Sequence, residues 1–281
     1  MDHRWPKAPP SGPLIFGASF GPGNTGQRAG PGGADKVNYN WNWGVFFQQT
    51  PDGDAFYWQW IAYGLVWTLA VSALAWVIAM SVGALIGTLR TTDKRWVVRL
   101  GNAWVELFRN IPLLVQMFLW YFVIPEFIPP LKRWMIETEP AYAQFLAAVL
   151  CLGLFTSARI AEQVRAGIQS LSRGQRNAGL AVGLTQAQVY RYVLLPMAFR
   201  IIIPPLTSET MNLIKNSSIA LTIGLAELTF RSREIGEYTF NFFEAFTAAT
   251  LIYITIAMTA NRVMAYVERR VAVPGYIGGG K

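Results

Sequence analysis

The sequence is poor in cysteine, histidine and charge, and each shortage excludes a class of protein. Cys151 is the only cysteine and His3 the only histidine among 281 residues. An intramolecular disulfide is therefore excluded, and so are a His/Cys metal cluster and the usual Ser/His or Cys/His catalytic pair. Only 14% of the residues are charged, against about 25% in an ordinary soluble domain. Together with 53% hydrophobic residues, this deficit is typical of a chain that lies largely within a membrane.

Apolar runs long enough to cross a bilayer indicate the fold class. No residue in the stretch 60–89 is charged, and roughly 20 residues suffice to cross the hydrocarbon core. We predict an all-α membrane protein with about five transmembrane helices, of which the remaining four lie at about 110–124, 140–158, 199–225 and 245–261.

Two of these predicted spans are irregular. The second is short, and residues 104–108 can extend it on the Arg109 side. The fourth contains Pro204-Pro205 and the charged residues Glu209 and Lys215, so we expect it to be kinked or broken at the prolines. Such a break is tolerated at membrane depth where protein or a cavity surrounds it.

The stretches around the spans define the domain organisation. Residues 1–36 are rich in Gly and Pro without periodicity, which predicts a disordered tail. Residues 37–59 form a periplasmic segment whose aromatic residues suit the membrane interface, and a small packed cap outside the bilayer fits them equally well. The transmembrane domain then covers 60–266, and residues 267–281 form a cytoplasmic tail.

Basic residues set the predicted orientation. The net charge is +8, but Lys and Arg lie mostly beside the apolar spans, which favours membrane topology over nucleic-acid binding as their explanation. Most of the 24 basic residues are in the loops after the first and third spans and in the C-terminal tail. We therefore expect a multi-pass protein of the bacterial inner membrane, with its N-terminus outside and its C-terminus in the cytoplasm.

The loop after the third span, at about 165–196, carries the most specific motif. Three residues separate Asn177-Ala178-Gly179 from Gly183, and nine more lead to Val193-Leu194-Leu195-Pro196. This pattern resembles the EAA loop of ABC importer permeases, in which an E-A-A triplet, a glycine and an I-x-L-P ending have the same spacing. The chain departs from the family at the first and third letters of the triplet, where Asn177 replaces the acidic residue.

The resemblance gives this loop a role in coupling. Gly183 permits a turn that other residues resist, so we expect two short helices joined by a bend, with a surface that fits a groove of a partner protein. In the family this coupling helix docks into the ATPase subunit, and an interfacial helix touching lipid headgroups is the alternative. The residues implied in coupling are Asn177, Ala178, Gly179, Gly183, Leu184, Leu195 and Pro196.

A second motif narrows the family. Residues 108–116 read F-R-N-I-P-L-L-V-Q and resemble the R-G-T-P-L-L-V-Q signature of polar amino-acid permeases, with Asn110 and Ile111 in place of Gly and Thr. Similar stretches at 40–44 and 211–217 extend the resemblance over about residues 38–276. It is closest to the glutamate/aspartate branch of the family.

The resemblance also implies partners. No G-x-x-x-x-G-K-[ST] motif is present, so ATP and Mg²⁺ are expected on a separate ABC ATPase, and no cofactor is expected on this chain. In the family two permease subunits pair, two ATPases attach inside, and a periplasmic amino-acid-binding protein delivers the substrate. A homodimer and a heterodimer of permeases fit the sequence equally well. We expect no nucleic-acid partner and no catalytic activity of this chain.

Ionisable residues within the spans are candidates for the substrate path, because charge is costly inside a membrane. Arg159 stands where related permeases tend to have an aromatic residue, and a guanidinium can hold a carboxylate through two hydrogen bonds. An alternative role for Arg159 is to anchor the end of its span or to pair with Glu162 or Gln163. The alternative for Glu209 and Lys215 is that they pair with each other. The residues expected along the path are Arg159, Glu162, Glu209, Asn212, Lys215 and Asn216.

These features predict a permease subunit of an ATP-driven importer for acidic amino acids such as glutamate and aspartate. A permease for general or neutral polar amino acids is the nearest alternative, and Arg159 distinguishes the two. An intramembrane enzyme is a weaker alternative, because no histidine supports the Ser and acidic residues of the spans. A passive channel subunit would have no use for the coupling loop.

Overall fold

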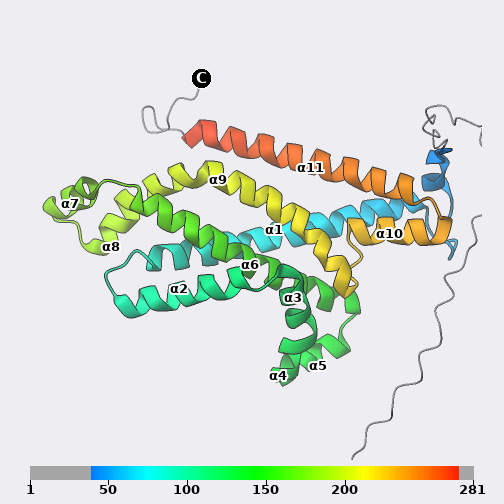
Figure 1. Cartoon of the computed structure of the whole chain (residues 1–281), viewed down its shortest axis with the longest axis horizontal. Helices are drawn as coiled ribbons and strands as arrows, with labels where there is room; N and C mark the ends of the chain where they lie inside the picture. The colour runs from blue at the N-terminus through cyan, green and yellow to red at the C-terminus, as the bar shows by residue number, and fades with distance from the viewer. Residues whose placement is uncertain (1–38, 272–281) are drawn as a thin grey trace, which may run out of the picture. The chain divides into compact units, whose positions relative to one another are not determined.

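The computed structural model describes residues 39–271, and within that range every regular element is a helix (Figure 1). The predicted tail at 1–36 and residues 272–281 lie outside the described residues. With η marking 3-10 or π-helical segments, the elements are η1 (Trp43–Phe47), α1 (Tyr57–Leu89), α2 (Arg95–Asn110), α3 (Leu113–Phe118), η2 (Leu119–Val123), α4 (Ile124–Phe127), α5 (Pro129–Glu137), α6 (Pro140–Gln169), α7 (Arg173–Ala181), α8 (Gln186–Val189), η3 (Tyr190–Leu194), α9 (Leu195–Asn216), η4 (Ser217–Ile223), α10 (Leu228–Thr239) and α11 (Phe242–Val271).

Four helical stretches are long and apolar enough to cross a membrane. They contain the first, third and fifth predicted spans and all but the last two residues of the fourth, and even the shortest has 30 residues. At about 1.5 Å per residue such a helix is roughly 45 Å long, which exceeds the ~30 Å hydrocarbon core. Each therefore extends beyond the core at one end or both. The four stretches are Tyr57–Leu89, Pro140–Gln169, Gln186–Ile223 and Phe242–Val271.

The second predicted span is not one straight helix. α2 ends at Asn110, and the stretch Leu113–Phe127 leaves it at an angle of 101°. Residues 104–108 therefore do not extend this span in a straight line. Pro112 causes the turn, because it has no N–H to continue α2 and restricts Ile111 to an extended conformation, with φ −91° and ψ 129°. Counting the bent pair as one span raises the number of candidate spans to five.

The buried side chain of Gln116 closes this turn. Its Nε2 donates to the carbonyl oxygens of Phe108 at 2.8 Å and Ile111 at 2.9 Å. Carbonyls at the end of a helix have no partner within the helix, and here a glutamine that is 3% exposed supplies one. Gln116, the last residue of the F-R-N-I-P-L-L-V-Q motif, therefore caps the end of α2 at the bend.

Of the two predicted alternatives for the fourth span, a kink or a break at the prolines, the break is wrong. α9 runs from Leu195 to Asn216 with Pro204 and Pro205 inside it. The irregular turns lie at its two ends instead, where the π-helical segment η3 precedes it and the 3-10 segment η4 follows. The two prolines remove N–H groups from α9, but the helical backbone persists around them.

Glycine sets the distance between α1 and α6. A Cβ added at Gly83 would lie 2.7 Å from Cβ of Ile160, and one at Gly87 would lie 2.7 Å from Cβ of Val164. Real side chains do not approach so closely, so these positions admit no larger residue without movement of a helix. Small residues allow close packing between membrane helices, where van der Waals contact replaces the hydrophobic driving force.

α6 also packs against α9, and this makes it the central helix of the bundle (Figure 1). A Cβ at Gly167 of α6 would lie 2.6 Å from Cγ2 of Ile202 in α9. The principal core lies around these helices and includes the fully buried Ala75, Leu152 and Ala198. Side chains on different faces of α6 therefore meet different neighbouring helices.

The aromatic segment before α1 packs on one side and is exposed on the other. Val45 of η1 is fully buried among residues of α1, α10 and α11, and the N–H of Asn42 donates to Oε1 of Glu244 at 2.6 Å. The rings of Trp41 and Trp43 stack 5.4 Å apart and are exposed. The segment thus combines features of both predicted alternatives, a packed cap and an aromatic interfacial surface.

The C-terminal helix passes the predicted end of the transmembrane domain. α11 continues to Val271, so residues 267–271 are helical and do not belong to a separate tail. Arg269 and Arg270 lie in its last turn, where positive charge is favourable because the helix dipole places partial negative charge there.

We expect the Gly83→Val variant to disrupt the packing of α1 on α6. Overpacking of this kind costs about 1–3 kcal/mol, so the purified protein should unfold at a lower temperature and yield less monodisperse material in detergent. Ala73→Val, at an exposed position of α1, is the control for a larger side chain on the same helix. Equal stability of the two variants would contradict the close approach.

We expect Gln116→Leu to destabilise the turn between α2 and α3. The buried carbonyl of Phe108 and the partly buried one of Ile111 would lose their donor, which costs about 1–3 kcal/mol for a buried group left unpaired. Thermal unfolding of the purified variant measures the loss. Val115→Leu, at a half-exposed position of the same helix, should unfold near the wild-type temperature. If Gln116→Leu is as stable as this control, Gln116 does not stabilise the turn.

Candidate functional site

The predicted path residues lie on two neighbouring helices. Arg159 and Glu162 are in α6, and the other four, Glu209, Asn212, Lys215 and Asn216, are in α9. The packing of α6 on α9 allows some of these side chains to meet, but the structure does not bring all six into one cluster.

Arg159 meets Glu209 across the contact between α6 and α9. Nη1 of Arg159 lies 3.9 Å from Oε2 of Glu209, and Nε2 of Gln163 donates to Oε1 of the same carboxylate at 3.4 Å. The alternative pairing of Glu209 with Lys215 is not found among the ion pairs of residues 39–271. Six residues of helix separate the two positions by roughly 240°, so their side chains leave α9 on different faces.

The guanidinium of Arg159 remains accessible. Its side chain is 44% exposed, whereas that of Glu209 is 12% exposed. The guanidinium carbon lies 5.0 Å from the centre of the Phe155 ring, a position in which ring and cation attract each other. A guanidinium has five N–H donors, and the single long contact to Glu209 leaves several of them able to bind a carboxylate.

Glu162 belongs to a different cluster and does not orient Arg159. Its Oε1 lies 2.9 Å from Nη2 of Arg90 and 3.7 Å from Nη1 of Arg109. Nε of Arg90 in turn donates to Oδ1 of Asn102 at 2.8 Å. These contacts join the end of α1, α2 and α6, so the structure gives Glu162 a bracing role in place of the predicted partnership with Arg159.

Arg90 is the central residue of this second cluster, and the sequence showed it only as one basic residue of a loop. It is 6% exposed, and a buried charge needs a partner such as Glu162 to compensate its desolvation. Its partners are 12 and 72 residues away, so no local pattern identifies them. The cluster surrounds a cavity of about 490 Å³ lined by Arg90, Asn102, Val105, Glu106, Arg109, Asn110, Glu162 and Arg165.

The remaining path candidates lie towards the C-terminal end of α9. Lys215 is exposed and lines a cavity of about 270 Å³ with Thr229 and Tyr253. Asn212 and Asn216 are half-buried. Among the described residues, no hydrogen bond or ion pair joins these three side chains to Arg159 or Glu209.

α7 and α8 form two short helices with a bend at Gly183. Gly183 has a φ of +86°, the left-handed region that favours glycine. The N–H of Leu184 donates to the Gly179 carbonyl at 3.2 Å and that of Gly183 to the Leu180 carbonyl at 3.0 Å, which together form a Schellman motif. Thr185 then caps α8 by accepting from the N–H of Gln188 at 3.4 Å.

The predicted coupling residues divide into exposed and packed ones. Asn177, Ala178, Gly183 and Pro196 are exposed, whereas Gly179 is buried and Leu184 and Leu195 are half-buried. A Cβ at Gly179 would lie 3.0 Å from Cγ2 of Val189 in α8, so this position fixes how α7 packs on α8. Two apolar side chains that the prediction did not include, Leu180 and Val182, are also exposed, at 44% and 78%.

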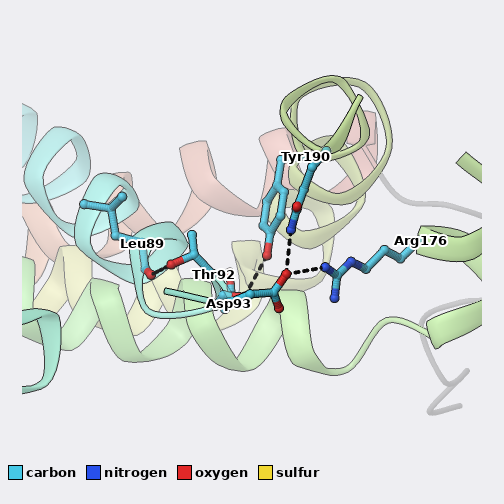
Figure 2. Close-up of polar contacts among 7 residues, drawn as sticks. Leu89, Thr92, Asp93, Arg176 and Tyr190 are labelled. Atoms are coloured by element: carbon cyan, nitrogen blue, oxygen red, sulfur yellow. Dashed lines mark hydrogen bonds and ion pairs between the residues drawn. The ribbon is translucent and has the colours of Figure 1, made fainter. Parts of the chain in front are cut away.

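The loop between α1 and α2 contacts both helices of the bend (Figure 2). Oδ2 of Asp93 accepts from Nη2 of Arg176 in α7 and from Nε2 of Gln186 in α8, both at 2.9 Å. The hydroxyl of Tyr190 donates to the carbonyl of Thr91 at 2.8 Å. The Gln186 amide and the Arg176 guanidinium hold the pKa of the Asp93 carboxyl below its usual range, so this group is ionised at neutral pH.

Comparison with known families identifies the class of protein that carries this arrangement. The sequence model of the family described as "Binding-protein-dependent transport system inner membrane component" matches residues 79–273, more than half of the chain. The chain belongs to this family. It is the multi-pass inner-membrane permease component of an ABC transporter, and ATP hydrolysis belongs to another subunit.

Individual relatives cover most of the permease. The glutamate/aspartate import permease protein GltJ of Escherichia coli (strain K12) is 52% identical over 245 residues, which make up 86% of this chain and 100% of GltJ. The glutamate/aspartate import permease protein GltK of Escherichia coli O6:H1 is 31% identical over 74% of this chain and 92% of GltK. The glutamine transport system permease protein GlnP of Escherichia coli (strain K12) is 32% identical over 75% of this chain.

Solved structures show the same fold. A chain from the "Crystal structure of an amino acid ABC transporter with histidines" is 31% identical, and the match covers 76% of the permease and 95% of that chain with a TM-score of 0.64. An inward-facing structure of the MetNI methionine ABC transporter matches 77% of the permease with a TM-score of 0.61 at 19% identity, and this likeness shows the fold alone.

Proposed function

We propose that this permease carries acidic amino acids, glutamate and aspartate, into the cell as part of an ATP-driven importer. The observation that carries the proposal is the 52% identity to GltJ along the whole length of that protein. Identity falls to 32% against GlnP, whose printed name assigns it to glutamine. The similarity therefore favours the acidic substrates over the neutral ones.

The contact of Arg159 with Glu209 supports this substrate class. Glutamate and aspartate carry one more carboxylate than neutral amino acids, and an accessible guanidinium can bind it through two parallel hydrogen bonds. Because the present contact is 3.9 Å long and the arginine is 44% exposed, a substrate carboxylate can reach Arg159 without the breaking of a buried ion pair. Glu209, itself held by Gln163, would then keep the guanidinium in place.

The bend at Gly183 is the surface that we assign to coupling. α7 exposes Ala178 and Leu180, and Val182 directly after it is also exposed; an amphipathic helix of this kind fits a groove in a partner. The partner proposed is the ATP-binding subunit, which would carry ATP and Mg²⁺. Its closure would push α7 and move the spans attached to it, α6 and α9.

The proposed assembly follows the family. A second permease subunit, similar to GltK, pairs with this one, and a periplasmic amino-acid-binding protein delivers the substrate. The N-terminus lies outside, and α7, α8 and the C-terminus lie in the cytoplasm. This orientation is supported by the basic residues of the α1–α2 loop and of the α6–α9 connection. The two segments lie at the same end of the bundle, where Arg176 contacts Asp93.

Uptake competition tests the substrate class. Cells that express the permease with its neighbouring subunits and binding protein should take up labelled glutamate, and excess aspartate should reduce that uptake strongly. Glutamine and arginine at the same excess should have little effect. Equal competition by glutamine would favour the neutral polar amino-acid permease and would remove the role given to Arg159.

We expect Arg159→Gln to weaken glutamate transport. A charge-assisted hydrogen bond contributes about 1.5–3 kcal/mol, so the KM for glutamate should rise roughly 10- to 100-fold. Reconstituted complexes with the same binding protein provide the measurement. Arg233→Gln, which removes an exposed arginine paired with Glu237 in α10, is the matched control, and an unchanged KM in Arg159→Gln would refute the proposed contact.

A further inference from the structure

The α1–α2 loop holds the two helices of the bend together through one oxygen atom. Oδ2 of Asp93 accepts from Arg176 before the bend and from Gln186 after it, at 2.9 Å each (Figure 2). The two donors are on opposite sides of Gly183, the residue at which the chain can most easily change direction. A carboxylate that binds both sides therefore restricts the angle between α7 and α8.

This loop is a rigid extension of α1. The hydroxyl of Thr91 donates to the Thr88 carbonyl at 2.7 Å, and that of Thr92 donates to the Leu89 carbonyl at 2.8 Å. The backbone N–H groups of Thr91 and Thr92 donate to the same two carbonyls, at 3.0 and 3.3 Å. Because each threonine is bound to the end of α1 by both its backbone and its side chain, Asp93 is held in a fixed place relative to α1.

Little other packing fixes α7 to the body of the protein. Gly179 is its one buried residue among those whose side-chain environment is described, and its contact is with Val189 of α8. A cavity of about 570 Å³ lies between the α1–α2 loop and the start of α7, and Thr91, Ser172, Arg176 and Tyr190 are among its lining residues. The position of α7 therefore depends on its polar contacts.

A second contact ties the same loop to the beginning of the fourth span. The Tyr190 hydroxyl donates to the Thr91 carbonyl at 2.8 Å. Tyr190 is the first residue of η3, the π-helical segment that joins α8 to α9. Segments of this kind occur often at functional sites and at places where a helix bends. The loop thus contacts α7, α8 and the junction with α9.

We infer that the α1–α2 loop is a third mechanical connection between the coupling segment and the membrane spans, with Asp93 as its positioning residue. The inference rests on the coupling role proposed for α7. The chain itself connects α7 to α6 and, through α8 and η3, to α9. The Asp93 contacts add α1, which Gly83 and Gly87 hold against α6. A push on α7 would then move α1 and α6 as one body instead of flexing the bend at Gly183.

The test compares Asp93→Ala with the wild type in the complete reconstituted complex. We expect the number of glutamate molecules imported per ATP hydrolysed to fall roughly three- to tenfold, within the range for mutations between coupled sites. ATP hydrolysis without substrate should rise, because ATPase closure would no longer have to move α1. Exposed ion pairs contribute little to stability, so the yield and unfolding temperature of the complex should not change.

Two further variants separate positioning from a general effect of charge. The exchange Asp93→Arg with Arg176→Asp restores an ion pair, and the Gln186 amide can accept from the new arginine through its oxygen, so import per ATP should recover relative to Asp93→Arg alone. Glu126→Ala breaks an exposed ion pair of 2.7 Å with Lys132, between α4 and α5, and should have no effect.

The outcomes distinguish the two proposals. The connection would be overturned if Asp93→Ala imported as much glutamate per ATP as the wild type. It would also be overturned if the double exchange imported no more per ATP than Asp93→Arg alone. If the wild-type complex imports no glutamate, the substrate assignment is wrong. The connection is then judged on ATP hydrolysis without substrate, which Asp93→Ala should still raise whichever amino acid the complex carries.

Discussion

The close approach of α1 and α6 is the constraint on which the rest of the structure depends. Gly83 and Gly87 lie where a side chain would collide with Ile160 and Val164 of the facing helix. Because the two helices touch along this line, Arg90 at the end of α1 comes within 2.9 Å of Glu162. The same contact directs the α1–α2 loop towards α7 and α8. The close packing of two glycines in the membrane thus determines which polar groups meet at the end of the bundle that holds α7 and α8.

α6 presents its charges to two neighbours, and the two clusters differ in kind. Glu162 contacts Arg90 at the end of α1 at 2.9 Å and Arg109 of α2 at 3.7 Å, and the side chain of Arg90 is only 4% exposed. Arg159 faces α9 across a longer contact, and its side chain is 44% exposed. A guanidinium that keeps its access to solvent retains donors for a ligand, whereas a buried one does not. This difference in exposure separates Arg90, which joins helices, from Arg159, the candidate binding charge.

The spans and the bend of the coupling segment could be predicted because both are local properties of the sequence. Apolar runs marked α1, α6 and α11, and the spacing around Gly183 marked the turn between α7 and α8. The contacts of Arg90 with Glu162 and of Asp93 with Arg176 and Gln186 join residues 72, 83 and 93 positions apart. No local pattern encodes such pairs. The 101° turn at Pro112 was missed, although its causes are local: Gln116 donates to carbonyls only five and eight residues before it.

Gln116 gives the F-R-N-I-P-L-L-V-Q stretch a structural role that does not depend on which substrate the permease carries. Its amide satisfies the carbonyls of Phe108 and Ile111, and Pro112 stops the preceding helix, so the motif encodes an angle between two segments. An angle of this kind makes no contact with cargo and serves acidic, basic and neutral substrates equally. Differences in cargo therefore have to be sought at positions outside the motif, such as Arg159.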